Sequence, residues 1–525
     1  MDVILAALGD LFTPYHLMIM SVATILGIVA GALPGITATM AVALIVPFTF
    51  TMTPVAGLIA IAALYTSTIF AGCIPSILLN TPGTPSSIAT CFDGYPMARQ
   101  GRGEEAIYSA TFASFVGGIF GAMVLVACAL PLAKVALRFG PPEIFWVAIF
   151  GMTIIASLSG ESLIKGIAGG VLGMMIGMVG IAPVGGDVRF DLGIPSFQGG
   201  IELISVLIGF FCIPELLRMA FDPNVDYEQM QVKEDEEDGA AAAALKSKES
   251  PLKLGWHNVM DVKNWGNVLR SCVIGAVIGV LPGVSGSIAN LVAYSEAKRA
   301  AKDPETFGKG NVQGIVATES SNNALVGGAM VPLLTLGVPG SPPAAIIYGT
   351  LLLHGLSPGP ELFTSRGDIT YVFLLSFFVA SAMVLIFGLP AGKAIYKIVI
   401  KIPTRVLVPS ILLLTVVGSY AIRSNEVDVI VMFIFGIIGY IVKEWEFSGG
   451  PIVLGLILGP FAEKGYVQGL IMGNAVSTSM PWLIFFTRPV CLVLIVLSLL
   501  SVSWPLIRMM MQKRNAARAA QGGAS

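Results

Sequence analysis

Charged residues are scarce in this sequence. Only 12% of its 525 residues are Asp, Glu, Lys or Arg, whereas 55% are hydrophobic. The 30 basic and 32 acidic residues nearly balance, and no basic stripe with interleaved aromatics predicts a nucleic-acid surface. The six cysteines are scattered without a CxxC pair or a Cys/His cluster. We therefore predict neither a thiolate metal site nor a disulfide framework.

Motifs of common enzyme classes are also missing. The sequence has no HExxH, no GxSxG and no P-loop, and its three histidines (His16, His257 and His354) lie far apart. The stretch Gly101–Ala106 formally fits a dinucleotide fingerprint but precedes no βαβ unit. We therefore expect that the protein is not an enzyme and that it binds neither a cofactor nor a transition metal. Without a P-loop, the sequence also does not predict an ATP-binding site on this chain.

Long apolar runs recur along the whole chain, whose mean hydropathy is +0.84. Since a bilayer core takes about 20 apolar residues per helix, they predict about ten to twelve crossings and shorter re-entrant pieces. The 60 Gly and 32 Pro suit close helix packing and broken helices in a membrane. Met1–Ser21 has no Lys or Arg, so the first apolar segment is expected to remain as a membrane helix. The predicted fold class is an all-α polytopic membrane protein.

One stretch appears twice. Gly27–Ala41 reads GIVAGALPGITATMA, and Gly275–Ala289 reads GAVIGVLPGVSGSIA. Pro removes a backbone donor and Gly allows positive φ, so we expect the helix to break at Leu-Pro-Gly in both copies. Within a bilayer, main chain freed in this way is tolerated only where protein or a water-filled cavity surrounds it. Two such breaks are typical of a transport site.

A second motif is repeated as well. Pro82-Gly83-Thr84-Pro85 corresponds to Pro339-Gly340-Ser341-Pro342. The offsets are 283 − 35 = 248 for the breaks and 340 − 83 = 257 for the turns, so the two motifs belong to one duplicated unit with a loop-sized insertion. We predict a re-entrant hairpin over Pro75–Ala89 with its tip at Thr81–Ser87. Duplications in transporters are commonly inverted, and we expect an inverted repeat here.

The repeats divide the chain into a first membrane half (residues 1–220), a polar cytoplasmic linker (221–267) and a second half (268–525). The linker contains the acidic run Glu234–Asp238, and the second half ends in further spans and a basic tail. Basic residues gather in Lys393–Arg405 and in the tail, which places both in the cytoplasm. The N-terminal segment, which lacks Lys and Arg, is expected outside.

The breaks and turns supply candidate site residues. Hard cations such as Na⁺ take oxygen ligands, so the ion-binding candidates at the breaks are Gly35, Thr37, Thr39, Gly283, Ser285 and Ser287. Stiff turns fix free amides that suit an anion, so the substrate-binding candidates are Thr81, Pro82, Gly83, Thr84, Ser86, Ser87, Pro339, Gly340 and Ser341. The alternative for the Leu-Pro-Gly breaks is a kink that only shapes helix packing. The alternative for the turns is a tight loop between two ordinary helices.

The run Glu319–Asn323 (ESSNN) interrupts an apolar stretch. An ionisable residue at membrane depth is a functional hypothesis by default. We add Glu319, Ser320 and Ser321 to the ion site, and Asn322 and Asn323 to the substrate site. The alternative is that Glu319 lies at a helix end near the surface. The corresponding stretch of the first half, Leu58–Thr68, has no acid, so the site is expected to be asymmetric.

With these motifs in place, the chain resembles the large membrane subunit of the tripartite tricarboxylate transporter family. The resemblance rests on GALPGITATMAVAL, LLNTPGTPSSIATCFDGYPMARQG, GVLPGVSGSIA, ATESSNNA and VPLLTLGVPGSPPAA, and extends by motif from Leu17 to Phe363. It implies a bacterial inner-membrane importer of tri- or dicarboxylates driven by a Na⁺ or H⁺ gradient. It also implies two partners, a small four-helix membrane subunit and a periplasmic solute-binding protein.

The paired hairpins suggest elevator-like alternating access, in which the repeat motifs move against the remaining spans. Two alternatives stay open at this point. The chain could be a channel, through which uptake would persist after the ion gradient collapses. It could also be a scaffold subunit whose partner carries the transport site.

Overall fold

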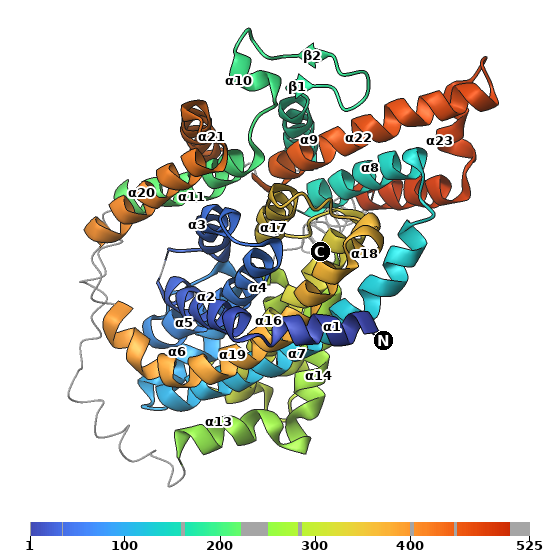
Figure 1. The fold of residues 1–525 in the computed structure, drawn as a ribbon. Coiled ribbons are helices and arrows are strands. Elements are labelled where there is room, and N and C mark those ends of the chain that lie inside the picture. The colour runs from blue at the N-terminus through green and yellow to red at the C-terminus, as the bar shows by residue number, and fades with distance from the viewer. Residues whose placement is uncertain are drawn as a thin grey trace, which may run out of the picture. The chain divides into compact units, whose positions relative to one another are not determined.

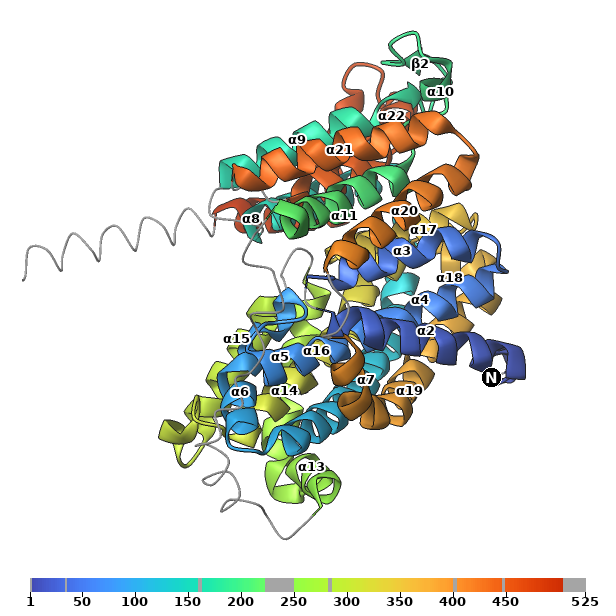
Figure 2. The ribbon, with the colours of Figure 1, turned by 90° about the vertical axis from the view of Figure 1, so that its left-hand side faces the viewer.

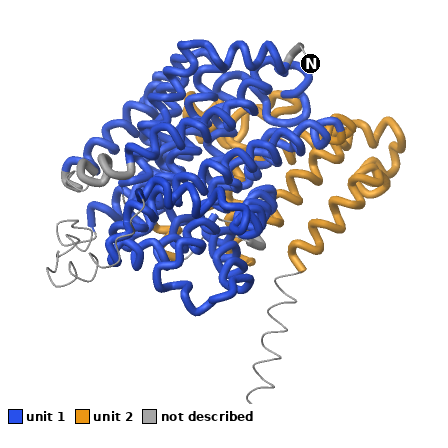
Figure 3. The backbone as a smooth tube through the Cα atoms, turned by 90° about the horizontal axis from the view of Figure 1, so that it is seen from below, with its two compact units in different colours: residues 1–134, 204–440 blue, residues 135–203, 441–525 orange. Residues whose placement is uncertain are grey.

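The computed structural model describes residues 2–33, 35–158, 163–221, 250–281, 286–399, 404–445 and 449–503. These residues are almost entirely helical, which confirms the predicted all-α class (Figure 1). The described residues form one small sheet, in which β1 (Gly180–Ile181) pairs antiparallel with β2 (Val188–Arg189). Two compact units are coloured in Figure 3, and each combines segments from both predicted halves.

Unit 1 comprises residues 1–134 and 204–440. Its helices before the predicted linker are α1 (Asp2–Leu11), α2 (Pro14–Ala32), α3 (Ala38–Phe50), α4 (Pro54–Ala71), α5 (Cys73–Leu79), η1 (Pro85–Thr90), α6 (Cys91–Arg99), most of α7 (Gly103–Ala136) and α11 (Leu203–Phe221). Those that follow are α13 (Pro251–Met260), η4 (Val262–Asn264), α14 (Trp265–Val280), α15 (Gly286–Ala300), η5 (Pro304–Thr306), α16 (Val312–Leu336), α17 (Pro342–Leu353), α18 (Glu361–Ser365), α19 (Gly367–Val399), α20 (Thr404–Arg423) and α21 (Glu426–Glu444).

Unit 2 comprises residues 135–203 and 441–525. It contains α8 (Pro141–Leu158), α9 (Leu163–Gly177), the small sheet, α10 (Pro195–Gln198), α22 (Gly449–Val476), η6 (Pro481–Leu483) and α23 (Ile484–Thr487). Two ion pairs lie within it: Arg488 binds Glu143 at 2.5 Å, and Arg189 binds Glu463. Glycines of α9 let it pack closely against α22, since a Cβ at Gly177 would lie 2.6 Å from the carbonyl oxygen of Leu456.

Six helices among the described residues are long and apolar enough to cross a membrane, or seven if the bent pair of α22 with residues 481–487 is one span. The six lie at Pro14–Ala32, Pro54–Leu79, Gly103–Ala136, Leu203–Phe221, Gly367–Ala391 and Val406–Arg423. The chain is therefore polytopic. A total of about ten to twelve crossings would require shorter apolar helices to cross as well, and this number stays a prediction.

The first predicted helix break is confirmed. α2 ends at Ala32, Leu33 is extended (φ −81°, ψ 111°), and Gly35 has a φ of +90°, which favours glycine. α3 then starts at Ala38, where the Thr37 hydroxyl caps the helix by accepting from the Met40 amide at 3.2 Å.

The second break resembles the first in its backbone conformation. α14 ends at Val280, Leu281 has nearly the same conformation as Leu33 (φ −82°, ψ 111°), and α15 starts at Gly286. The predicted ion-binding residues Gly283 and Ser285 lie outside the described residues. The boundaries of α14 and α15 still place an interruption at the expected position in the second copy.

Both copies use the same glycine contacts to join two helices. On α2, a Cβ at Gly27 would lie 2.6 Å from the Leu64 carbonyl oxygen, and Gly31 meets the Thr68 carbonyl oxygen of α4. In the second copy, Gly275 and Gly279 of α14 meet the Ser321 and Leu325 carbonyl oxygens of α16. The equivalences are 27 + 248 = 275, 31 + 248 = 279, 64 + 257 = 321 and 68 + 257 = 325, the two offsets found in the sequence. Small residues one turn apart permit this close approach.

The predicted hairpin over Pro75–Ala89 appears as α5, a turn and η1, followed directly by α6. Asn80 ends α5 in the left-handed conformation (φ 53°), and the Gly83 amide returns to donate to the Gly72 carbonyl oxygen at 3.2 Å. A Cβ at Gly94 of α6 would lie 2.8 Å from the Ile77 side chain of α5, so the two helices lie side by side. α6 continues to Arg99, and α7 begins only four residues later at Gly103.

Candidate functional site

Glu319 lies inside the helix bundle of unit 1. It occupies the interior of α16, and its side chain is fully buried. Its carboxylate accepts from the Thr90 hydroxyl at 2.6 Å and from the Ser114 hydroxyl at 3.2 Å. The alternative of a surface position at a helix end is therefore wrong. A carboxylate loses its hydration when it is buried, and hydrogen bonds to both of its oxygens compensate for that loss.

Thr90 and Ser114 come from two separate elements, and the sequence analysis missed both. Thr90 ends η1, and Ser114 lies on α7. Thr90 also lies 3.0 Å from the hydroxyl of Thr318, which precedes Glu319 on α16. The hairpin of the first half therefore contacts α16, the helix of the second half that carries Glu319, directly.

The residues after Glu319 carry polar atoms that the protein leaves unsatisfied. Asn322 donates to the Ile69 carbonyl oxygen of α4 at 3.4 Å, and Asn323 donates to the Ser114 carbonyl oxygen at 3.2 Å. Their side-chain carbonyl oxygens, and the hydroxyls of Ser320 and Ser321, are buried with no hydrogen-bond partner among the described residues. Since buried polar atoms are nearly always paired, this cluster is suited to a ligand.

The turn of the first half, Thr81–Ser87, contacts the start of α15, the helix that follows the second break. Ser287 on the first turn of α15 donates to the Pro85 carbonyl oxygen at 2.7 Å, and Asn290 donates to the Ser86 carbonyl oxygen. A Cβ at Gly286 would lie 3.7 Å from the Ser86 hydroxyl and 3.9 Å from the Asn322 side-chain oxygen. η1, α15 and α16 therefore converge, as Figure 2 shows for α15 and α16 beside α5 and α6.

The turn itself is a compact hydroxyl cluster. Thr84 lies 3.1 Å from the Ser86 hydroxyl and 2.9 Å from that of Ser87, and all three side chains are buried. The backbone packs just as closely, since a Cβ at Gly83 would lie 2.5 Å from the Gly31 carbonyl oxygen on the last turn of α2. The end of α2 that precedes the first break therefore adjoins the same turn.

The other predicted residues lie away from the Glu319 carboxylate or make local contacts. Gly35 faces the Met219 sulfur, Thr37 caps α3, and Thr39 is buried. Ser341 caps α17, and α17 packs on α3 and α4. Among the described residues, the remaining candidates are Thr81 and Pro82, which are half-buried, and Pro339 and Gly340, which are buried. The second turn thus contacts the first half, as the first turn contacts the second.

Asp93 is a second buried carboxylate that the sequence analysis missed. It lies on α6, and one of its oxygens accepts from the amides of Gly308, Gly310 and Asn311 at 2.8–2.9 Å. The other oxygen accepts from the Tyr294 hydroxyl at 2.9 Å. Asp93 therefore fastens the hairpin of the first half to the loop that begins α16, and so positions Glu319 relative to Thr90.

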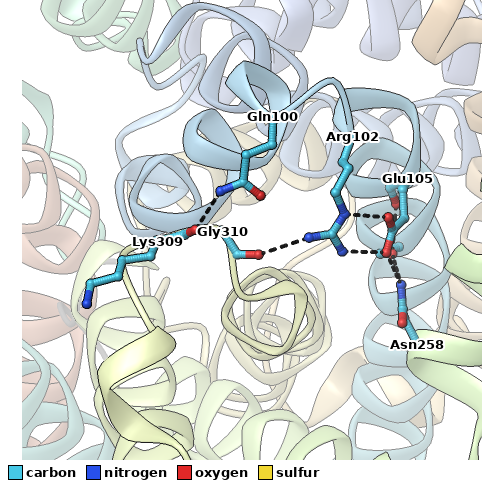
Figure 4. A network of polar contacts seen from close by, with 7 residues as sticks. Gln100, Arg102, Glu105, Asn258, Lys309 and Gly310 are labelled. Atoms are coloured by element: carbon cyan, nitrogen blue, oxygen red, sulfur yellow. Dashed lines mark hydrogen bonds and ion pairs between the residues drawn. The ribbon is translucent and has the colours of Figure 1, made fainter. Parts of the chain in front are cut away.

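A polar network extends this connection at the start of α7 (Figure 4). Arg102 forms a bidentate pair with Glu105 at 2.9 Å and 2.9 Å, and Gln100 donates to the Lys309 carbonyl oxygen at 2.8 Å. Asn258 of α13 donates to Glu105 at 3.0 Å. Fork-like Arg–carboxylate pairs fix geometry as well as charge, so this network orients the loop before α16.

Comparisons with known proteins agree with these motifs. Residues 17–454 match the model of the tripartite tricarboxylate transporter TctA family. Two relatives from Agrobacterium vitis are similar to this chain. An "Uncharacterized 52.8 kDa protein in TAR-I ttuC' 3'region" is 32% identical over 96% of this chain and 95% of its own length. An "Uncharacterized protein in TAR-II ttuC' 3'region" is 33% identical over 46% of this chain and 97% of its own length. No solved structure matches.

Proposed function

Since this chain belongs to the tripartite tricarboxylate transporter TctA family, a family of transporter components, we propose that it is the secondary active importer of its system. Its substrates are carboxylates of the tri- or dicarboxylate class, and a Na⁺ or H⁺ gradient drives their uptake. It works in the bacterial inner membrane. A periplasmic solute-binding protein delivers the substrate, and a small four-helix membrane subunit completes the assembly.

The observation that carries this proposal is the buried Glu319 beside unsatisfied oxygens. Ser320, Ser321 and the side-chain oxygens of Asn322 and Asn323 follow it on α16 without partners in the described part of the chain. A hard cation takes oxygen ligands of this kind, and a buried carboxylate supplies the compensating charge. Protonation of Glu319 would meet the same need in a proton-coupled system. The coupling ion is therefore assigned to this segment.

The substrate is assigned to the neighbouring turn. The hydroxyls of Thr84, Ser86 and Ser87 can donate to a carboxylate, and the Asn290 and Asn322 side chains flank Ser86. The turn contacts α15 through Ser287 and contacts Glu319 through Thr90. Ion and carboxylate would therefore share one set of hydrogen bonds, which is what coupled transport requires.

Uptake measurements test the assignment of the driving force. We expect membrane vesicles that contain this chain, its small subunit and a loaded solute-binding protein to accumulate radiolabelled citrate when a Na⁺ or proton gradient is imposed. Accumulation should stop when an ionophore collapses the gradient. Uptake that continues down the citrate gradient would favour a channel. Uptake by vesicles that lack this chain would show that a partner carries the site.

Because the turn hydroxyls are buried, substrate entry requires movement, which we propose to be elevator-like. α3 belongs to the repeat motifs, and α20 belongs to the remaining spans. A Cβ at Gly418 of α20 would lie 3.4 Å from the Cβ of Pro47 on α3, close to the spacing across a disulfide. This pair therefore offers a cross-link between the two proposed bodies.

In the double variant Pro47→Cys/Gly418→Cys, oxidation is expected to abolish uptake, and reduction should restore it. The single variant Pro47→Cys, oxidised in the same way, should transport normally and controls for damage to the native cysteines. Gly418→Cys alone is a poorer control, because its Cβ would lie 2.5 Å from the Cγ of Pro47. Mass spectrometry would measure how much of the cross-link forms. Full uptake by completely cross-linked protein would rule out relative movement of α3 and α20.

A further inference from the structure

The short helix α13 has two unlike faces. Its inner face packs on the start of α7, because Gly255 and Val259 are buried and a Cβ at Gly255 would lie 2.7 Å from the Tyr108 Cβ. Asn258, next to this face, donates to Glu105 at 3.0 Å and to Ser109 at 3.1 Å. The inner face is therefore fixed to the bundle by both packing and hydrogen bonds.

The outer face of α13 exposes large apolar side chains. Leu252 and Trp256 are 43% and 47% exposed, although the Trp256 ring also packs edge-on against Phe112 at 5.3 Å. The exposed surface continues through Val262 of η4, at 84%, to Trp265. Lys253 and Lys263 lie between these side chains in the sequence and are also exposed. Exposed Trp and aliphatic side chains interleaved with Lys are typical of a helix in a membrane interface.

Trp265 begins an apolar stripe along α14. Trp265, Leu269, Val273 and Val277 follow one another at intervals of one turn and are 43–56% exposed. The opposite face, including Gly275, packs on α16. In a polytopic membrane protein, such a stripe faces acyl chains, and a Trp at its end marks the headgroup level.

The contacts of α13 with α7 indicate its depth relative to the membrane. Tyr108, Ser109 and Phe112 lie in the first turns of the candidate span Gly103–Ala136. At 1.5 Å per residue, Phe112 is only about 14 Å along the helix from its first residue. α13 therefore packs beside the end of a span and not beside its middle.

We propose that α13 and η4 lie in the headgroup region of the bilayer, with Trp256, Val262 and Trp265 inserted among the lipids. A lipid surface is the occupant because the exposed apolar surface of α13 and η4 is continuous with the exposed apolar stripe of α14, and the exposed Lys253 and Lys263 beside it suit lipid headgroups. The backbone carbonyl of Asn258 also accepts from the Gln313 side chain, on the first turn of α16, at 3.0 Å. Anchoring of α13 in the lipid would therefore fix the N-terminal end of α16, the helix that carries Glu319. The inference does not depend on the proposed substrate or coupling ion.

Quenching of tryptophan fluorescence by brominated phosphatidylcholine tests this inference. The other five tryptophans (Trp146, Trp265, Trp445, Trp482 and Trp504) are replaced by Phe, and the full chain is reconstituted in vesicles. We expect Trp256 emission to fall most when bromine lies near the headgroup end of the acyl chain, and less when it lies near the methyl end. A second variant that keeps only Trp265 should show the same order.

The matched control is Arg299→Trp in a chain whose six native tryptophans are all replaced by Phe. Arg299 lies on the exposed end of α15. This tryptophan should respond to aqueous iodide and little to brominated lipid. The inference is overturned if Trp256 and Trp265 behave like this control, because they would then face water. It is equally overturned if neither quencher reaches them, because protein would then cover α13. Size-exclusion chromatography checks that each variant is folded.

Discussion

Replacing Glu319 with Gln is expected to lower gradient-driven uptake about 10- to 100-fold, because hydrogen bonds to a charged group contribute roughly 1.5–3 kcal/mol. Gln keeps the size of Glu and can still accept from Thr90 or Ser114, so the protein should fold. It cannot bind a proton or supply a negative charge, and the cation would lose its countercharge. The measurement is initial uptake of labelled carboxylate as a function of Na⁺ concentration and of pH.

Glu296→Gln is the matched control. Glu296 lies on the exposed part of α15, where its hydrogen bond to Arg299 lowers the pKa of its carboxyl group. It is charged but makes no contact with the Glu319 segment in the described structure, so its loss should leave uptake unchanged. If Glu319→Gln transports with unaltered rate and ion dependence, Glu319 is not the coupling acid.

The second large effect is expected at Asp93, where Ala should lower the free energy of unfolding by about 3–5 kcal/mol. The buried Gly310 amide and the Tyr294 hydroxyl would lose their acceptor, and each unsatisfied buried donor costs roughly 1–3 kcal/mol. The amides of Gly308 and Asn311 are only part-buried and can bind water instead. Asn at this position keeps one acceptor oxygen for the three amides and should cost less. Thermal unfolding of the purified variants in detergent would measure both changes.

Asp303→Ala provides the control for Asp93, because Asp303 precedes the same loop but is exposed. Its unfolding temperature should stay close to that of the wild type, since surface substitutions usually change stability by less than about 0.5 kcal/mol. Equal stability of Asp93→Ala and the wild type would show that this carboxylate does not fasten the hairpin to α16.

Local backbone chemistry made the breaks predictable. Leu33 and Leu281 have the same extended conformation because each precedes Pro-Gly, and Thr37 caps the next helix as its type favours. The glycines one turn apart in each copy also indicate close helix packing. Gly27 and Gly31 on α2 repeat as Gly275 and Gly279 on α14, and all four meet carbonyl oxygens of the partner helix.

The partners of Glu319 could not be predicted from the sequence. Thr90 and Ser114 resemble any other hydroxyl residues of an apolar helix, and only tertiary packing brings them to α16. Asp93 could not be identified for a related reason, since its partners Tyr294 and Gly308 lie 201 and 215 residues away in the sequence. A side chain that acts on a distant loop leaves no periodic pattern in its own segment.

The duplication preserves packing but not chemistry. With the offset of 257, the position of Glu319 corresponds to Ala62 (319 − 257 = 62), which is buried in α4. Asn322 similarly corresponds to Tyr65 (322 − 257 = 65), which is also buried in α4. The two copies therefore differ in residue type, whereas the asymmetry of the transport site stays a prediction. Among the described residues, η1 of the first half binds an acid through Thr90, which favours one coupling centre at Glu319.

The most direct test of the account is an experimental structure of the protein with its partners, citrate and Na⁺. We expect the citrate carboxylates to lie within hydrogen-bonding distance of the Thr84–Ser87 turn, beside Asn290 and Asn322. We expect the ion, or in a proton-coupled system a protonated carboxyl, at Glu319. Citrate bound at a place that touches none of η1, α15 and α16 would contradict the account.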